Sequence, residues 1–277
     1  MLHKIDIMTT TALFDKLWNE YVKRTPSAKK VKDLFESQGN TILNDHVAFR
    51  TFDDPRVNID VLATAFINNG YEYKNDYHFP KKKLYAKHFE HKTDKNAPLV
   101  FISELITSEL STEAQSIVKN TLDSVDFDEV DPMTLVFSGK LWNTPSYDLY
   151  STLLNESEYA AWLYVNGFCS NHFTINVNEL DTFSGLEEVN NFLKDNGFEM
   201  NVSGGEIKGS QESLLEQSSI LADKIEMDFM EGKKEITSCY YEFAYRYMEN
   251  GTLFKGFIAD SADKIFESTD VNQAVLS

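Results

Sequence analysis

The segment DHVAFRT at residues 45–51 decides the fold, because its side chains alternate as in a β-strand with two different faces. One face carries His46 and Arg50 with a small alanine between them, and the other carries valine and phenylalanine. A histidine and an arginine on one strand face indicate a functional site. The alternative is a surface pair or a core histidine with satisfied hydrogen bonds, and this segment alone does not decide between them.

A second segment, CSNHFTINV at residues 169–177, repeats this pattern and places His172 near the start of another alternating strand. Each histidine is followed by a helical stretch and then by an Asn-Gly pair before an aromatic residue, which is typical of a helix end. Gly70 follows His46 by 24 residues, and Gly197 follows His172 by 25 residues. The expected helices cover residues 58–69 and 182–195. This spacing predicts an internal repeat of the form strand, helix, strands.

We expect one globular α+β domain that contains two βαβββ units. Its expected parts are an N-terminal helical segment (1–40), the first unit (41–106), a helical insertion (107–168), the second unit (169–248) and a C-terminal segment (249–277). After its helix, the first unit is expected to form strands at 77–90, with an interruption at residues 81–83, and at 99–105. The corresponding strands of the second unit are expected at 198–202, 214–229 and 235–247, with a hairpin at 231–234.

The charge, the apolar runs and the cysteine spacing of the chain limit which partners and which compartment we expect. The chain has 26 basic and 44 acidic residues and a net charge of −18, which argues against nucleic acid and against an anionic membrane surface. No apolar run is long enough to span a membrane, and residues 1–10 lack the features of a signal peptide, so we expect a cytoplasmic protein. Cys169 and Cys239 lack the spacing of a zinc or redox motif and are expected to be small buried hydrophobes.

Glu242 lies in the aromatic-rich strand 238–246, where a carboxylate is costly unless a cation, hydrogen bonds or a metal compensates it. The alternative is a salt bridge to Arg246 or a lysine on a solvent-facing side of the sheet. Two histidines and one carboxylate from three strands would form the facial triad that suits Fe(II) and leaves open positions. We therefore predict that His46, His172 and Glu242 bind one metal ion.

The repeat and these three residues resemble the vicinal oxygen chelate superfamily and, more closely, the DUF1338 family, which includes 2-oxoadipate dioxygenase/decarboxylases. The segments that carry the resemblance are residues 45–51, 98–105, 166–174, 215–219, 239–243 and 263–269. The resemblance implies that Fe(II) and dioxygen convert a 2-oxo dicarboxylic acid to a 2-hydroxy acid one carbon shorter, with release of CO2. Zinc, nickel or manganese could occupy the site in a purified sample.

Arg50 lies four residues after His46, or about 13 Å along a strand at about 3.3 Å per residue. This distance favours contact with the far carboxylate of the substrate over contact with its metal-bound end. Arg246, His78 and His88 are weaker candidates for substrate binding. Glu104 could supply a fourth metal ligand, which would favour a glyoxalase-like isomerase or a hydrolase. A small-molecule binding protein without turnover is the third alternative.

Overall fold

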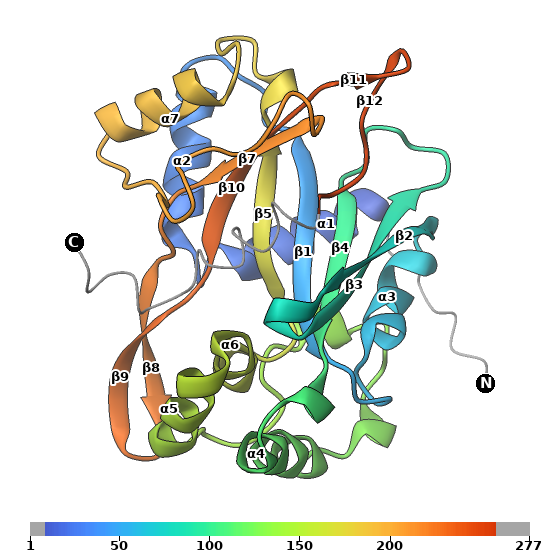
Figure 1. The fold of residues 1–277 in the computed structure, drawn as a ribbon, viewed down its shortest axis with the longest axis vertical. Coiled ribbons are helices and arrows are strands. Elements are labelled where there is room, and N and C mark those ends of the chain that lie inside the picture. The colour runs from blue at the N-terminus through green and yellow to red at the C-terminus, as the bar shows by residue number, and fades with distance from the viewer. Residues whose placement is uncertain (1–8, 259–277) are drawn as a thin grey trace.

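The computed structural model describes residues 9–258, and its central feature is a curled, mixed sheet of eight strands (Figure 1). The strand order is β2-β3-β4-β1-β5-β10-β7-β6. The strands are β1 (Asn44–Phe52), β2 (Tyr71–Phe79), β3 (Leu84–His91), β4 (Leu99–Leu105), β5 (Ser170–Asn176), β6 (Lys208–Ser210), β7 (Leu215–Ser219) and β10 (Tyr240–Arg246). Together with the flanking helices, the sheet makes an α+β fold.

The two halves of the sheet have the same strand order from the centre outward. β1 and β5 meet antiparallel at the centre, and each has a parallel neighbour, β4 or β10, that comes later in its own half. One helix follows each central strand, namely α3 (Ile59–Ile67) in the first half and α7 (Leu186–Asp195) in the second. The repeat predicted from the His-to-Gly spacing is therefore present in the chain topology.

The N-terminal helices α1 (Thr10–Tyr21) and α2 (Pro26–Ser37) confirm the predicted helical pair and cover one face of the sheet. Tyr21 lies 5.1 Å from Phe173 between ring centroids, and Phe35 lies 6.1 Å from Phe243. All four rings are buried, and burial of each aromatic ring stabilises the fold by about 1.5–3 kcal/mol. Because these helices occupy the phenylalanine face, the histidines of β1 and β5 lie on the opposite face.

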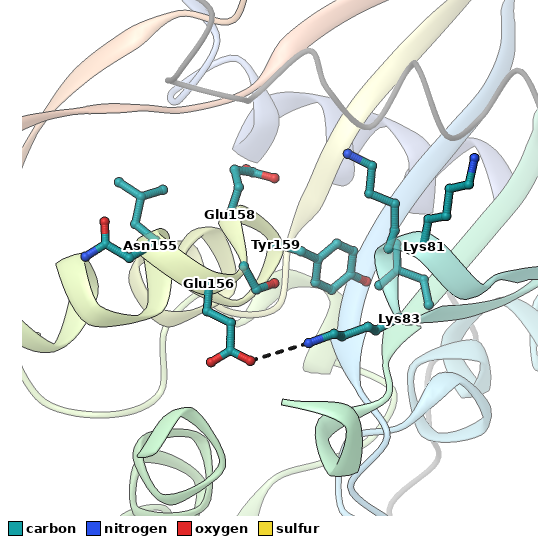
Figure 2. Close-up of a pocket in the computed structure, with 10 residues that line it drawn as sticks. Lys81, Lys83, Asn155, Glu156, Glu158 and Tyr159 are labelled. Atoms are coloured by element: carbon teal, nitrogen blue, oxygen red, sulfur yellow. Dashed lines mark hydrogen bonds and ion pairs between the residues drawn. The ribbon is translucent and has the colours of Figure 1, made fainter. Parts of the chain in front are cut away.

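The helical insertion contains α4 (Thr112–Asp123), α5 (Tyr147–Glu156) and α6 (Glu158–Asn166), with 3-10 turns η2 (Thr107–Glu109), η3 (Phe127–Glu129) and η4 (Leu135–Phe137). Ser157 caps α6, and Gly167 ends it with φ 65°. The junction of α5 and α6 faces η1 (Pro80–Lys82), which interrupts the predicted 77–90 strand. Between them lies a cavity of about 280 Å³ (Figure 2).

All three strand predictions for the second unit are wrong, and the predicted 235–247 strand divides between β9 (Gly232–Thr237) and β10, which belong to different sheets. Residues 198–202 make only the single bridge Met200–Ile220, and the 214–229 segment divides into β7 and β8 (Lys224–Phe229). β7 ends at Ser219, and the carboxylate of Asp223, between β7 and β8, accepts hydrogen bonds from the Ser27 amide and hydroxyl at 3.0 and 2.6 Å. β8 and β9 then form a separate hairpin, whose turn is at residues 230–231 and not at 231–234.

Several smaller predictions are also resolved. Helix α7 begins at Leu186, later than the predicted residue 182, after the 3-10 turn η5 (Val177–Glu179). Cys169 and Cys239 are buried free cysteines, as expected.

The C-terminal segment includes β11 (Met248–Glu249) and β12 (Thr252–Leu253), whereas residues 263–269 lie outside the described part of the chain. Within residues 9–258, every helix is too short or too polar to cross a membrane.

Candidate metal centre

Strand register brings the predicted residues together on one face of the sheet. His46 on β1 and Glu242 on β10 both pair with Thr174 on the strand between them. His172 lies one step further along, between Ala48 on β1 and Tyr240 on β10. The alternation of each strand then directs the two imidazoles and the carboxylate to the same side.

The three side chains form a compact and buried cluster. One ligand atom from each of His46, His172 and Glu242 lies within 4.8 Å of the others, which confirms the predicted convergence. Their exposed fractions are 2%, 5% and 0%. Two imidazole nitrogens and a carboxylate oxygen this close together could hold one divalent metal ion.

Each histidine is oriented by a hydrogen bond at Nδ1. The Nδ1 of His46 lies 2.7 Å from the Asp45 carboxylate, and the Nδ1 of His172 lies 3.0 Å from the Asn171 side-chain oxygen. Because both partners are acceptors, each Nδ1 donates its proton and each Nε2 is left with a lone pair. Burial, with the charges of His46 and Arg50, lowers the pKa of His172 well below its usual range, so this ring stays neutral.

Glu242 has one satisfied oxygen and one orphaned oxygen. Its Oε1 accepts from the Thr174 hydroxyl at 3.1 Å and from the Gln217 amide at 2.7 Å. Its Oε2 lies 3.8 Å from Nε2 of His172 and has no hydrogen-bond partner within the described residues. Burial raises the pKa of Glu242. A buried carboxylate oxygen beside two imidazole lone pairs fits a divalent cation, which would compensate all three groups.

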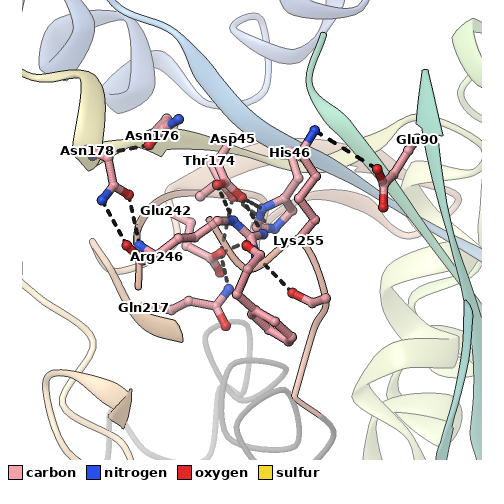
Figure 3. A network of polar contacts seen from close by, with 12 residues as sticks. Asp45, His46, Glu90, Thr174, Asn176, Asn178, Gln217, Glu242, Arg246 and Lys255 are labelled. Atoms are coloured by element: carbon pink, nitrogen blue, oxygen red, sulfur yellow. Dashed lines mark hydrogen bonds and ion pairs between the residues drawn. The ribbon is translucent and has the colours of Figure 1, made fainter. Parts of the chain in front are cut away.

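A second layer of contacts connects this cluster to the C-terminal segment (Figure 3). Arg246 donates to both oxygens of Asp45 at 2.6 and 2.8 Å, and it also donates to the carbonyls of Phe254 and Gly256 at 3.0 and 2.8 Å. Burial alone would raise the pKa of Asp45, but the Arg246 guanidinium holds that pKa below its usual range. Asp45 therefore stays ionised and keeps its hydrogen bond to His46.

Arg50 is buried on the same sheet face, with an exposed fraction of 1%. Its Nη1 donates to both carboxylate oxygens of Glu158, at 3.1 and 3.2 Å. The guanidinium lies 4.8 Å from the ring centre of Tyr159 and 5.1 Å from that of Trp162. The strand and helix contacts thus fix this side chain in one position.

The weaker sequence candidates do not enter the cluster. Arg246 is buried, and its donors are committed to Asp45 and the two carbonyls. His78 is exposed next to Asp76, and His88 bonds Tyr77. Glu104 accepts from the Ile59 amide at 3.0 Å and lies outside the three-residue cluster.

Sequence reasoning missed several residues that surround the cluster. Asp45 and Thr174 lie in the quoted segments, and their positions beside or on the histidine face were a usable signal. Tyr240 stacks on His172 with ring centroids 4.7 Å apart, and its buried hydroxyl has no hydrogen-bond partner within the described residues. Phe257 lies 4.9 Å from the ring of His46 and covers it. No local pattern marks Phe257.

Fold and site together are consistent with a mononuclear metal site on a mixed sheet. Residues 9–253 match the family model described as 2-oxoadipate dioxygenase/decarboxylase. The chloroplastic/amyloplastic 2-oxoadipate dioxygenase/decarboxylase of Oryza sativa subsp. japonica is 37% identical, over 91% of this chain and 76% of that protein. This chain belongs to the 2-oxoadipate dioxygenase/decarboxylase family.

Two solved structures have a similar fold. A crystal structure described as that of a hydrolase from Shewanella frigidimarina NCIMB 400 is 48% identical, with a TM-score of 0.85 over 91% of this chain and 98% of that one. The hydroxyglutarate synthase from Oryza sativa in complex with 2-oxoadipate is 35% identical, with a TM-score of 0.88 over 94% of this chain and 92% of that one.

Proposed function

We propose that this protein is an Fe(II)-dependent enzyme that converts 2-oxoadipate and dioxygen to 2-hydroxyglutarate and CO2. Atoms balance in this reaction, because the C1 carboxyl group leaves as CO2 and both oxygen atoms of dioxygen enter 2-hydroxyglutarate, one in its new carboxyl group and one in its hydroxyl group. The observation that carries the proposal is the orphaned Oε2 of Glu242 beside the lone pairs of His46 and His172, in a chain of this family. The bound substrate of the rice relative supports the choice of 2-oxo acid.

The fold supports this assignment in more detail. We infer that the two halves of the sheet are βαβββ units of the vicinal oxygen chelate type, and that both belong to one domain. β1 and β5 join them as an antiparallel pair with two register shifts, and each strand supplies one histidine. Since the site draws on both units, neither unit alone would hold the metal.

His46, His172 and Glu242 would hold the metal, and two imidazoles with one carboxylate favour Fe(II), although zinc, nickel or manganese also bind such ligands. An iron ion here would supply the electron-transfer chemistry that lets a 2-oxo acid react with dioxygen. Glu104 is not near the cluster, so the four-ligand arrangement considered for an isomerase or hydrolase is not supported.

The remaining residues would bind and orient the substrate. Along the strands, Ala48 lies two residues and Arg50 four residues from His46, which places Arg50 about 13 Å from the His46 level. The methyl side chain of Ala48 leaves room for an aliphatic chain, and Arg50 would bind the distal carboxylate. Burial raises the pKa of Tyr240 well above its usual range, so its hydroxyl keeps the proton and can donate it to a substrate oxygen.

Aromatic rings would limit access of water to the reacting groups. Phe257 contacts the rings of His46 and Phe101, with centroids 4.9 and 4.8 Å away, and its amide donates to the Tyr77 hydroxyl. A dry site strengthens the hydrogen bonds and ion pairs that orient the substrate.

The proposal is tested by reaction stoichiometry. Anaerobically purified protein supplied with Fe(II) should consume one O2 for each CO2 and each 2-hydroxyglutarate formed from 2-oxoadipate. Product formation without oxygen uptake would instead indicate a hydrolase or isomerase, and binding without product would indicate a binding protein.

A further inference from the structure

The buried Arg50 already has a carboxylate partner. Its Nη1 contacts both oxygens of Glu158, at 3.1 and 3.2 Å, which is the type of contact a substrate carboxylate would make. Tyr159 and Trp162 hold the guanidinium in place through their rings. An incoming distal carboxylate would therefore meet a guanidinium that another negative charge already neutralises.

Glu158 is placed so that it can leave this contact. Its side chain is 19% exposed, whereas that of Arg50 is 1% exposed. It is the first residue of α6, so its backbone is fixed by the helix while its side chain retains rotational freedom. It also lines the cavity of about 280 Å³ between η1 and the α5–α6 junction.

The same cavity can receive the displaced carboxylate. Its wall includes Lys81, Lys82 and Lys83, three consecutive cations in a chain of net charge −18 (Figure 2). Lys83 lies 3.4 Å from Glu156, so part of this positive charge is already used. Lys81 is exposed at the cavity edge, where it could attract either the displaced Glu158 or an incoming dianion.

We propose that substrate binding is a carboxylate exchange, in which the distal carboxylate of the 2-oxo acid replaces Glu158 on Arg50 and Glu158 turns into the lysine-lined cavity. This inference rests on the proposed function, because it requires Arg50 to bind the distal carboxylate. Glu158 is then a specificity-determining residue. A dicarboxylic substrate replaces the negative charge that it displaces, whereas a monocarboxylic one leaves the Arg50–Glu158 pair intact.

The exchange makes an unusual prediction for Glu158→Gln. Without substrate, the buried Arg50 guanidinium of this variant lacks its counter-ion, so the Tm should fall. The variant also lacks the Glu158 carboxylate that competes with the substrate for Arg50. Calorimetric titration of Fe(II)-loaded protein without oxygen should show 2-oxoadipate bound about tenfold more tightly, as expected for loss of a competing charge-assisted hydrogen bond. 2-Oxohexanoate, which has a methyl group at the distal end, should not bind more tightly.

Glu156→Gln is the matched control, because it removes the same charge at the α5–α6 junction from a residue that bonds Lys83 and not Arg50. In this variant the dissociation constant of 2-oxohexanoate should stay unchanged, and that of 2-oxoadipate should change much less than in Glu158→Gln. If Glu158→Gln does not fold, Glu158→Asp keeps the charge but shortens its reach, and should tighten 2-oxoadipate binding selectively by a smaller factor.

Weaker binding of 2-oxoadipate to Glu158→Gln would overturn the exchange and make Glu158 a residue that holds Arg50 in position. Equal changes for the two ligands, or no change for either, would also overturn it. Failure of the proposed function looks different: the wild-type protein would not bind 2-oxoadipate, or Arg50→Lys would affect both ligands equally.

Discussion

Asp45 links the candidate metal ligand His46 to the rest of the molecule through a single carboxylate. It orients the imidazole through Nδ1, and it receives two hydrogen bonds from Arg246, which also holds the carbonyls of Phe254 and Gly256. A carboxylate behind a histidine ligand fixes its tautomer and raises its basicity. The position of the C-terminal segment over the site and the strength of metal binding should therefore be coupled.

Asp45→Asn should weaken metal binding by about 10- to 100-fold, because an amide is a poorer acceptor for His46 and loses the charge that Arg246 pairs with. Competition with a chelator at fixed pH measures this affinity. Asp54→Asn, which alters an ion pair with Arg56 elsewhere, serves as the control and should bind metal normally. An unchanged affinity in Asp45→Asn would show that the hydrogen bond to His46 has no role in metal binding.

Arg50→Lys keeps the charge but loses the planar guanidinium that contacts a carboxylate through two N–H groups. The variant should retain metal and lose turnover of 2-oxoadipate chiefly through KM, by roughly 1.5–3 kcal/mol. Monocarboxylic 2-oxo acids should be nearly unaffected. Equal losses for the two substrate classes would assign Arg50 to the metal-bound end or to the fold.

Residue-scale prediction from sequence succeeded where a strand pattern carries the signal. His46, His172 and Glu242 each stand on an alternating strand, and that alternation gave their common face. The partners of Asp45 and Arg50 could not be found in this way, because Arg246 and Glu158 lie 201 and 108 residues away in the chain. Such pairs depend on how strands and helices pack, which no local pattern records.

At the scale of elements, β1 carries the candidate metal ligand His46 and also Arg50, which we propose binds the distal carboxylate of the substrate. Ala48 lies between them. The small side chain of Ala48 faces His172 across the ladder, on the path from His46 to Arg50. A larger residue here would occupy the space assigned to the aliphatic chain of the substrate.

Ala48→Leu should therefore raise KM for 2-oxoadipate at least about tenfold while metal content stays near the wild-type value, since overpacking in a buried site typically costs about 1–3 kcal/mol. Steady-state kinetics and elemental analysis of the same sample measure the two quantities. Ala63→Leu, in the buried side of α3, controls for general overpacking. Comparable KM values in Ala48→Leu and wild type would place the substrate elsewhere.

The sequence predicted the repeated order of strand and helix, but it did not predict the later strands of the second unit. The spacings from histidine to glycine, 24 and 25 residues, predicted a helix of similar length in each half, which is a local property of the chain. The 214–229 alternation looked like one strand, but the structure divides it into β7 and β8, and Asp223 between them contacts Ser27. That contact joins residues 196 positions apart, so the sequence pattern could not reveal it.

For the whole molecule, the cluster places an uncompensated carboxylate oxygen at the junction of the two halves of the sheet. A ligand that binds only the folded state stabilises it by about 2.7 kcal/mol at 100 times its Kd. Added divalent metal should therefore raise Tm by several degrees, and a chelator should reverse the change. The same titration of Glu242→Gln should give little shift. An equal shift in this variant would locate the metal at another site.

The most direct test of the account is a titration of chelator-treated, oxygen-free protein with Fe(II), followed by measurement of oxygen uptake with 2-oxoadipate. If His46, His172 and Glu242 hold the catalytic ion, the rate of oxygen uptake should rise linearly and stop rising at one Fe(II) per chain. Glu242→Gln should gain no activity over the same range. Oxygen uptake that is independent of added metal, or that Glu242→Gln recovers at the same equivalence point, would contradict the claim that His46, His172 and Glu242 hold the catalytic ion.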